Sequence, residues 1–173
     1  MVECRIEVER DVAAIREVVG AAFGQPDEAD LVEALRRDPA VWIPGLSVVA
    51  TDAGGDAVGY VLLTRCRVGG CQALALAPCA VAPERQSRGV GTDVTAYVLD
   101  EARTRTVNES PVENLVVVLG HPEFYSRFGF RPASDVGIAA SFEVPDEALM
   151  YLALDPDEPI PSGVIEYPAA FGV

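Results

Sequence analysis

The hexapeptide Gln86-Ser87-Arg88-Gly89-Val90-Gly91 separates an apolar run, residues 73–82, from a run with helical character, residues 90–105. A glycine-rich turn between a strand and a helix directs several backbone N–H groups toward one point. The first turn of the helix adds partial positive charge, because its N–H groups have no intrahelical acceptor. The hexapeptide therefore predicts a receptor for phosphate.

A second apolar run, residues 115–119, follows the predicted helix and consists entirely of Leu and Val. Such a continuous run is typical of a strand that is buried on both faces. The order strand, helix, strand predicts a parallel pair joined by a right-handed crossover. Ligands of such units lie beyond the carboxyl ends of the strands, and the glycine turn falls there.

The N-terminal part of the chain is predicted to form a strand and two helices. Residues 4–8 alternate as in a strand, and apolar residues at one-face spacing indicate a helix that begins after an N-cap at Asp11 and ends at Gly24. Asp27 or Asp30 is predicted to cap a shorter helix. The apolar side of this second helix is predicted to consist of Leu31, Ala34 and Leu35.

The middle of the chain is predicted to be an antiparallel meander. Residues 46–51, 57–68 and 72–82 are the expected strands, separated by glycine-containing turns. Pro78 lies inside the third strand. A proline there implies an edge, a bulge or a local loss of pairing, because it has no N–H to donate.

The remainder contains two further predicted elements, a short helix at residues 123–128 and a strand at residues 149–154. A Pro-rich tail, residues 155–173, closes the chain. Because no linker or internal repeat interrupts the sequence, we expect one domain, residues 1–173, with its core in residues 3–154.

The formal net charge is −14, and all thirteen basic residues are Arg. An acidic surface repels the phosphate backbone of nucleic acids and anionic membranes, so we expect neither as a partner. The same surface attracts a cationic small molecule or basic peptide, or it serves solubility alone. No apolar run approaches the ~20 residues of a membrane span, and the N-terminus lacks the layout of a secretory signal, so we expect a cytoplasmic location.

The four Cys and the single His, His121, offer little material for a metal site, and we expect no metal. Cys66 and Cys71 flank a predicted hairpin turn, where the two thiols could face each other. In a cytoplasmic protein we expect both to be reduced and packed. The sequence leaves open whether they ever form a disulfide.

Three kinds of phosphate-binding turn can be compared with the hexapeptide. A nucleotide P-loop requires a Lys after its last Gly, and the chain contains no Lys. A dinucleotide fold requires Gly-x-Gly-x-x-Gly, and Val94 occupies the position of the third glycine. The third kind, Gln/Arg-x-x-Gly-x-Gly/Ala, agrees with the hexapeptide at each fixed position.

Through this third pattern the chain resembles the GNAT superfamily of N-acetyltransferases, in which the pattern binds the pyrophosphate of coenzyme A. Residues 76–85 are similar to the family's fourth strand and the beginning of its loop. Phe124-Tyr125-Ser126-Arg127-Phe128-Gly129-Phe130 resembles the family's Phe-Tyr-x-x-x-Gly-Phe segment at a matching spacing. The resemblance covers residues 3–154, and Tyr167-Pro168-Ala169-Ala170-Phe171 is similar to one bacterial branch of uncharacterised members.

The resemblance implies an α+β (mixed α/β) fold with a mostly antiparallel central sheet of six to seven strands, one parallel, splayed βαβ pair and about four flanking helices. Acetyl-CoA, the only cofactor implied, would bind where the parallel strands part, with its pantetheine amides on a strand edge. The implied contacts are Val81 and Ala82 for the pantetheine, and Gln86, Ser87, Arg88, Gly89, Val90, Gly91 and Thr92 for the pyrophosphate. Arg85 and Arg88 add positive charge, or they are ordinary solvated arginines.

Acetyl transfer requires that the amine loses a proton, that the oxyanion is stabilised and that the CoA thiolate gains a proton. The resemblance assigns the last role to Tyr125, whose alternative is packing against Phe128 or Phe130. His121 would lie near the acetyl group, where it relays a proton or merely caps the short helix. Residues 74–77 carry no carboxylate, so the general base stays unassigned.

The sequence thus predicts an acetyl-CoA-dependent N-acetyltransferase in which a primary amine attacks directly and forms a tetrahedral intermediate. Glu28, Asp30 and Glu33 lie in the helical region that in the family helps to form the acceptor pocket; they would bind a cationic amine or keep the helix soluble. The alternatives are a non-catalytic acyl-CoA-binding module and transfer of another acyl group. The sequence does not specify the acceptor, a small molecule or a peptide, or whether the protein is a monomer or a homodimer.

Overall fold

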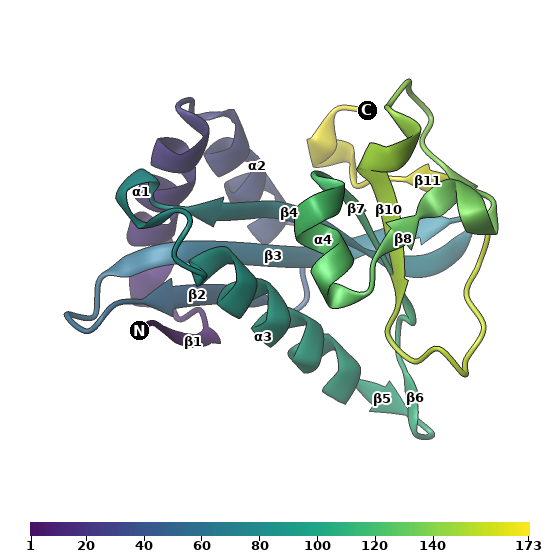
Figure 1. Cartoon of the computed structure of the whole chain (residues 1–173), viewed down its shortest axis with the longest axis horizontal. Coiled ribbons are helices and arrows are strands. Elements are labelled where there is room, and N and C mark those ends of the chain that lie inside the picture. The colour runs from purple at the N-terminus through teal and green to yellow at the C-terminus, as the bar shows by residue number, and fades with distance from the viewer. The chain divides into compact units, whose positions relative to one another are not determined.

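The computed structural model describes residues 1–173, and the chain divides into two compact units (Figure 1). The first unit comprises residues 1–63 and 77–101, and the second comprises residues 64–76 and 102–173. Three elements continue from one unit into the other: β3 Ala57–Val68, β4 Cys71–Val81 and α3 Val90–Thr104.

The first unit contains an antiparallel meander and two N-terminal helices. These elements are β1 Glu3–Ile6, α1 Val12–Phe23, α2 Asp27–Arg36 and β2 Ser47–Thr51, together with the first part of β3. β2 pairs antiparallel with β1 on one side and with β3 on the other, where Val48 lies opposite Val61. The predicted strands and both predicted helices are confirmed in this unit.

Asp11 stands at the predicted N-cap position of α1, but its side chain makes no capping hydrogen bond; its carboxylate instead accepts the N–H of Val8 at 2.7 Å and binds Arg5 at 2.7 and 2.9 Å. For α2 the predicted cap and the predicted apolar side are wrong, since Pro26 is the N-cap. Leu31 is half-buried and Ala34 is exposed. The residues that α2 buries are Ala29, Val32 and Leu35. The helix begins at its first aspartate, and residues three apart then share the inner face.

A chain of polar contacts links α2 to the face of the sheet that bears Tyr60. The Tyr60 hydroxyl shares a hydrogen bond of 2.7 Å with Ser47 Oγ, and Ser47 Oγ donates to a carboxylate oxygen of Glu7. The same carboxylate accepts from two guanidinium nitrogens of Arg36, at 3.1 and 3.0 Å. Burial, with the Glu7 charge, raises the pKa of Tyr60, so this hydroxyl stays protonated.

The opposite face of β3 receives the beginning of α3. A Cβ on Gly59 would come within 2.6 Å of Val90 Cγ1, so only a glycine lets the helix approach so closely. Successive strand residues point to opposite faces. Gly59 faces α3, and Tyr60 faces the side on which α2 lies. The two helices therefore cover opposite faces of the first unit's sheet, as the ribbons of Figure 1 also show.

The second unit contains the predicted parallel pair. β7 Leu115–Leu119 runs parallel to β4, with residues 74–76 opposite residues 116–118, and antiparallel to β10 Leu149–Ala153. The short helix α4 Pro122–Tyr125 follows β7. With α3 between β4 and β7, the chain has the predicted α+β fold, a mixed sheet with four α-helices.

Several short strands of the second unit were not predicted. They are β5 Thr106–Val107, β6 Ser110–Pro111, β8 Arg131–Pro132, β9 Ile138–Ala139 and β11 Gly163–Glu166. β11 lies in the Pro-rich tail; it pairs antiparallel with β3, where Ile165 lies opposite Val68, and parallel with β9. A two-residue strand is too short to show alternation, and the four residues of β11 lie in a Pro-rich segment, where a strand is not expected.

All four cysteines are free thiols, in agreement with the expected reduced state. Cys66 is buried, and burial raises the pKa of its thiol to about 12. Cys71 is exposed, so the expectation that it would be packed is wrong. A thiol as weakly acidic as that of Cys66 is a poor nucleophile for disulfide exchange.

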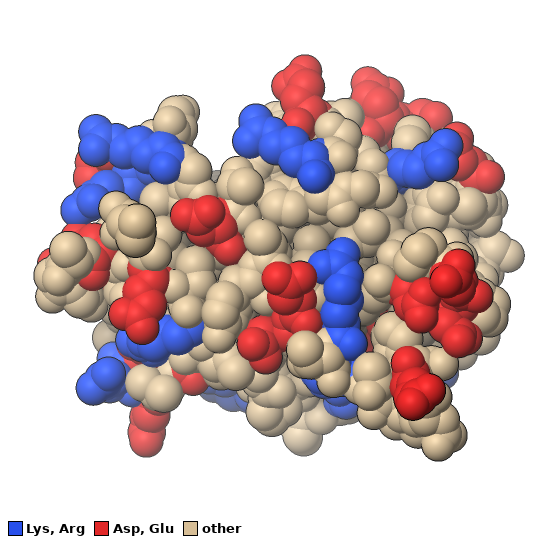
Figure 2. All heavy atoms as spheres, turned by 60° about the horizontal axis from the view of Figure 1, so that its bottom comes forward, with Lys and Arg blue, Asp and Glu red and all other residues tan.

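The surface carries both signs of charge. Figure 2 shows Asp and Glu side chains interspersed with Arg on the displayed face. The excess of 27 acidic over 13 basic residues gives the chain its negative charge. No helix is both long enough and apolar enough to cross a membrane.

Candidate active site

The glycine turn lies in the first unit, between the end of β4 and the beginning of α3. A 3-10 turn, Pro83–Arg85, leads into it. Ser87 and Gly89 then adopt positive φ angles of 60° and 86°. Glycine takes such a conformation without strain, whereas for Ser87 it costs about 1–2 kcal/mol. The turn is therefore held in a specific, partly strained shape.

The first turn of α3 presents backbone donors at this loop. α3 begins at Val90, and a hydrogen bond of 2.9 Å runs from the N–H of Asp93 to the carbonyl of Gly89. The three residues before Asp93 thus have no acceptor for their N–H groups inside the helix. Together with the helix dipole, this arrangement favours an anion.

The end of β4 has one edge already paired. The N–H of Ala82 donates to the carbonyl of Val58 in β3 at 2.9 Å, and its carbonyl accepts from Arg85 at 2.8 Å. Because the C=O and N–H of one trans peptide point in opposite directions, the Val81 carbonyl points away from β3. Gln86 Nε2 donates a hydrogen bond of 3.1 Å to this carbonyl. The carbonyl oxygen of Val81 keeps a second lone pair, which can accept another hydrogen bond.

The two arginines of the loop differ in their surroundings. Arg85 binds the carboxylate of Asp52 in the β2–β3 turn at 2.7 Å, so it fastens the loop to that turn. Arg88 is exposed and forms no ion pair. Arg85 is therefore already paired with a carboxylate, whereas Arg88 is the unpaired cation of the hexapeptide.

The parallel ladder ends before β4 does. Its last pair is Leu76 opposite Val118, whereas β4 continues to Val81. Pro78, which has no N–H to donate, lies in this last part of β4. The predicted strand thus continues through Pro78, and its ladder with β7 stops before that residue.

In the second unit, Tyr125 is buried at the end of α4. Its ring makes edge contacts with Phe124 and Phe130, with centroids 4.9 and 5.6 Å apart. Phe128, the other predicted neighbour, contacts Phe124 instead. On the remaining side, a Cβ on Gly120 would come within 2.4 Å of the Tyr125 ring. The ring is therefore fixed, which suits both a packing role and a precisely oriented hydroxyl.

His121 lies immediately before α4 and its side chain is exposed. His121 is the N-cap residue of α4, as one of the two expectations has it, but its imidazole makes no capping hydrogen bond. Its backbone carbonyl accepts the N–H groups of Phe124 and Tyr125, each at 3.1 Å. The imidazole is left in contact with solvent, one helical turn from Tyr125.

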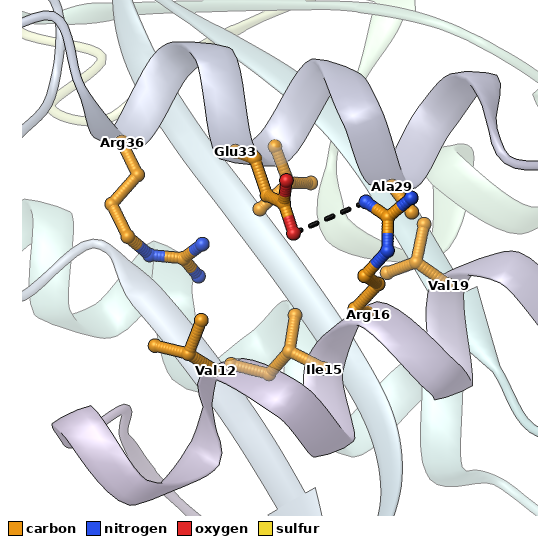
Figure 3. Close-up of a pocket in the computed structure, with 8 residues that line it drawn as sticks. Val12, Ile15, Arg16, Val19, Ala29, Glu33 and Arg36 are labelled. Atoms are coloured by element: carbon orange, nitrogen blue, oxygen red, sulfur yellow. Dashed lines mark ion pairs between the residues drawn. The ribbon is translucent and has the colours of Figure 1, made fainter.

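The carboxylates of α2 that could have bound an amine already have partners. Arg16 of α1 binds Asp30 at 2.8 Å and Glu33 at 3.1 Å, and Gln25 donates to Glu28 at 3.0 Å. Figure 3 shows the Arg16–Glu33 pair across the space between α1 and α2. This space has no room for a water molecule. It offers no place for an acceptor.

The structure thus gathers the predicted cofactor residues in the first unit, between Val81 and Thr92, and the predicted catalytic residues His121 and Tyr125 in the second. The sequence did not reveal that Asp52 anchors the loop through Arg85, or that Gly120 confines the Tyr125 ring. The contact between Gly120 and Tyr125 had one signal in the sequence, a glycine directly after an apolar strand, because a glycine often allows another group to approach the backbone closely.

Comparisons with known proteins agree with this arrangement. Residues 44–132 match the family model described as the acetyltransferase (GNAT) domain. The chain is 39% identical over 142 residues to the uncharacterized N-acetyltransferase YjhQ of Escherichia coli K12, covering 79% of this chain and 74% of that protein. It is 34% identical over 132 residues to the uncharacterized N-acetyltransferase YhbS of the same strain, covering 75% and 74%.

Two crystal structures share the fold over nearly the whole chain. One is YhbS from Escherichia coli in complex with CoA, with a TM-score of 0.87 and 27% identity over 99% of this chain and 92% of that chain. The other is a GNAT family acetyltransferase from Brucella melitensis in complex with acetyl-CoA, with a TM-score of 0.77 and 29% identity over 99% and 98%. The chain belongs to the GNAT family of N-acetyltransferases.

Proposed function

We propose that this N-acetyltransferase binds acetyl-CoA at residues 86–92 and transfers its acetyl group to a primary amine. The observation that carries the proposal is the loop itself, with positive φ at Ser87 and Gly89 and a helix whose first hydrogen bond begins at Asp93. The solved relatives from Escherichia coli and Brucella melitensis, bound to CoA and acetyl-CoA, support the same ligand.

The donor is held by backbone groups and one arginine. The amides of Gly89, Val90, Gly91 and Thr92, with those of Ser87 and Arg88 in the turn, bind the pyrophosphate, whereas the Gln86 N–H is engaged by the Pro83 carbonyl and Gln86 braces the loop. Arg88, exposed and without an ion pair, adds a charge-assisted hydrogen bond. Val81 supplies the backbone contact to the pantetheine, since both backbone groups of Ala82 are engaged and Ala82 instead holds the loop in place.

The last residues of β4 offer the pantetheine a strand edge. β4 continues beyond its last pair with β7, and its outer edge there carries the Val81 carbonyl. Pantetheine amides can pair with such an edge as a further strand does. A bound donor of this kind is fixed along the strand, which orients its thioester for attack.

The reaction forms a C–N bond and breaks a C–S bond. The neutral amine attacks the thioester carbonyl, the tetrahedral intermediate expels the CoA thiolate, and the nitrogen loses one proton. Tyr125 donates its hydroxyl proton to the thiolate as general acid and is reprotonated from solvent. His121, exposed and next to α4, relays the proton that leaves the amine. The products are the acetamide and CoA thiol.

Thiol release from acetyl-CoA against a panel of primary amines tests the function. We expect turnover with at least one amine, and Arg88→Gln should raise the KM for acetyl-CoA about tenfold with little change in kcat, because one charge-assisted contact is lost. Arg10→Gln is the matched control, because Arg10 is also an exposed arginine and lies far from the loop in the sequence. Tight CoA binding with no turnover on any amine would mean that the chain is a binding module instead.

Tyr125→Phe tests the general acid. The variant keeps both ring contacts and lacks only the hydroxyl, so we expect kcat to fall about 10²- to 10⁴-fold. Tyr151→Phe, in β10, should leave kcat unchanged. Equal kcat in Tyr125→Phe and wild type would remove Tyr125 from the mechanism.

A further inference from the structure

The second unit contains an open pocket that the reaction scheme above does not use. It lies between β9 and the beginning of β10 and has a volume of about 250 Å³. Its principal lining residues are Ile138, Phe142, Glu143, Val144, Asp146 and Leu149. This volume equals that of roughly eight water molecules, so the pocket, called the Phe142 pocket here, has room for a small organic ligand.

We propose that the Phe142 pocket binds a second cationic group of the acceptor, so that the preferred substrate is an amine that carries another ammonium group on an apolar spacer. This inference rests on the proposed function and names the class of acceptor. The apolar side chains would cover the spacer, and Glu143 and Asp146 at the rim would bind the charge.

The charges of this pocket are unmatched within the protein. Glu143 and Asp146 are exposed and neither forms an ion pair. Asp146 accepts a hydrogen bond of 3.1 Å from Ser134 Oγ, which orients its carboxylate. Phe142 lines the same pocket, and the face of an aromatic ring attracts a cation. Glu33 of α2 differs from these two carboxylates, because it already forms an ion pair with Arg16.

The group bound in the pocket is not the one that is acetylated. A carboxylate stabilises the protonated form of a nearby amine, and an ammonium nitrogen has no lone pair with which to attack a thioester. The reacting nitrogen must therefore be a different one in the same molecule. This requirement distinguishes a substrate with two cationic groups from a simple monoamine.

The pocket lies at the edge of the second unit that also carries the predicted catalytic residues. Leu149, which lines it, pairs with Leu119, the last residue of β7, and the N–H of Gly120 donates to the Ala148 carbonyl at 2.9 Å. Because β10 is antiparallel to β7, the beginning of β10 lies at the carboxyl end of β7. Tyr125 follows that end within a few residues.

The C-terminal tail positions the wall of the pocket. The Tyr167 ring lies 6.1 Å from the ring of Phe142 and 5.2 Å from that of Phe171. β11 pairs in parallel with β9, where Gly163 lies opposite Ile138. Since Ile138 and Phe142 both line the pocket, the tail acts on it through these two residues.

Steady-state kinetics with two matched acceptors test the proposal. Cadaverine carries two amines on a five-carbon chain, and 5-aminopentanol replaces one amine by a hydroxyl of about the same size. We expect wild type to favour cadaverine in kcat/KM about tenfold. Glu143→Gln/Asp146→Asn should reduce this preference to about one, because kcat/KM falls much more for cadaverine than for 5-aminopentanol.

The matched control removes two carboxylates from the tail of the same unit, with Asp157→Asn/Glu158→Gln. It changes the net charge equally, so a preserved preference for cadaverine excludes a general electrostatic effect. An unchanged preference in Glu143→Gln/Asp146→Asn, or no preference in wild type, would overturn the proposal. Unaltered CoA affinity shows that the variants are folded.

Tyr167→Leu tests the positioning role of the tail. We expect the KM for cadaverine to rise several-fold while the KM for acetyl-CoA is unchanged, because only the Phe142 wall is disturbed. An equal rise of both KM values would indicate a structural effect and would remove this role from the tail.

A binding experiment separates this inference from the proposed function. Cadaverine is titrated into the CoA complex of wild type and of Glu143→Gln/Asp146→Asn by calorimetry. Weaker binding to the variant supports the pocket even when no amine is turned over, in which case the acetyl-transfer proposal alone fails. Equal binding to both, with normal turnover of another amine, overturns the pocket alone.

Discussion

Gly120 is the residue on which the orientation of Tyr125 depends. A Cβ added there would come within 2.4 Å of the Tyr125 ring, and the ring has Phe124 and Phe130 on its other sides. The ring therefore cannot move aside without disturbing both aromatic contacts. The Tyr125 ring can take its position only because Gly120 has no side chain.

Gly120→Ala is expected to lower stability by about 1–3 kcal/mol through overpacking and to lower kcat more than the KM for acetyl-CoA. Urea unfolding and steady-state kinetics measure the two effects. Gly20→Ala in α1 is the matched control, since a Cβ there meets nothing within 4 Å; it should stabilise the chain by about 0.4–1 kcal/mol. Full activity and stability in Gly120→Ala would contradict the close packing.

Asp11 should make stability depend on pH. Its hydrogen bonds with Arg5 and the Val8 N–H hold the pKa of Asp11 below its usual range, against the opposing effect of burial. A lowered folded pKa means that the contribution is present above the unfolded pKa of about 4 and is lost as pH falls through the folded value.

We therefore expect Asp11→Asn to destabilise the chain by about 1–3 kcal/mol at neutral pH, with a difference that shrinks below about pH 4. Denaturant unfolding of both proteins from neutral to acidic pH measures it. Asp157→Asn, an exposed aspartate in the tail, should differ from wild type by less than about 0.5 kcal/mol throughout. A pH-independent difference for Asp11→Asn would refute the ionic origin.

At the scale of elements, Glu113 joins three segments of the second unit. It is buried just before β7, and its carboxylate accepts from Arg65 of β3 at 3.3 Å and from Arg105, after α3, at 2.7 Å. A buried carboxylate that binds two arginines is satisfied only while both segments stay in place. The contact thus fixes how the crossover from α3 returns to β7.

Glu113→Gln should lower the unfolding free energy by about 1–3 kcal/mol, because it leaves two guanidinium groups without their anion. This loss of unfolding free energy is smaller than for a fully buried ion pair, because both arginine side chains are partly exposed. Thermal unfolding compares it with Glu109→Gln, at an exposed glutamate of the β5–β6 turn, which should be neutral. Equal melting temperatures for the two variants would show that the bridge adds no stability.

At the scale of the whole molecule, the acidic charge should act on the acceptor rather than on the fold. A chain with a net charge of −14 attracts a cation over the distance that salt does not screen, which is about 10 Å at 0.1 M. On the face shown in Figure 2, Arg side chains lie among the Asp and Glu side chains, so we expect the attraction there to be moderate.

The kcat/KM for a dicationic amine is therefore expected to fall several-fold between about 20 mM and 0.3 M NaCl. 5-Aminopentanol, with one charge, should show roughly half the slope of cadaverine on a logarithmic scale. Stopped-flow or steady-state rates at constant pH measure both slopes. Equal slopes for the two amines would mean that the net charge does not steer the acceptor.

The sequence by itself determined the features that depend on neighbouring residues. Apolar segments separated by glycine-containing turns indicated β2 and β3, the apolar segment at residues 149–154 indicated β10, a continuous apolar run indicated β7, and the hexapeptide indicated the turn before α3. These signals are local because a strand or helix period and a glycine turn are properties of a short segment. The family resemblance rested on the same local motifs.

The tertiary structure decided what those segments do to one another. Only the fold shows that Arg16 forms an ion pair with Glu33, that Arg85 forms one with Asp52, and that the Pro-rich tail pairs with β9. Such pairings join residues far apart in the sequence, and no periodicity records them. The hexapeptide alone thus predicts a phosphate receptor, whereas the pocket that Glu143, Asp146 and Phe142 line together became visible only in the fold, which brings β9, the loop after it and the beginning of β10 together.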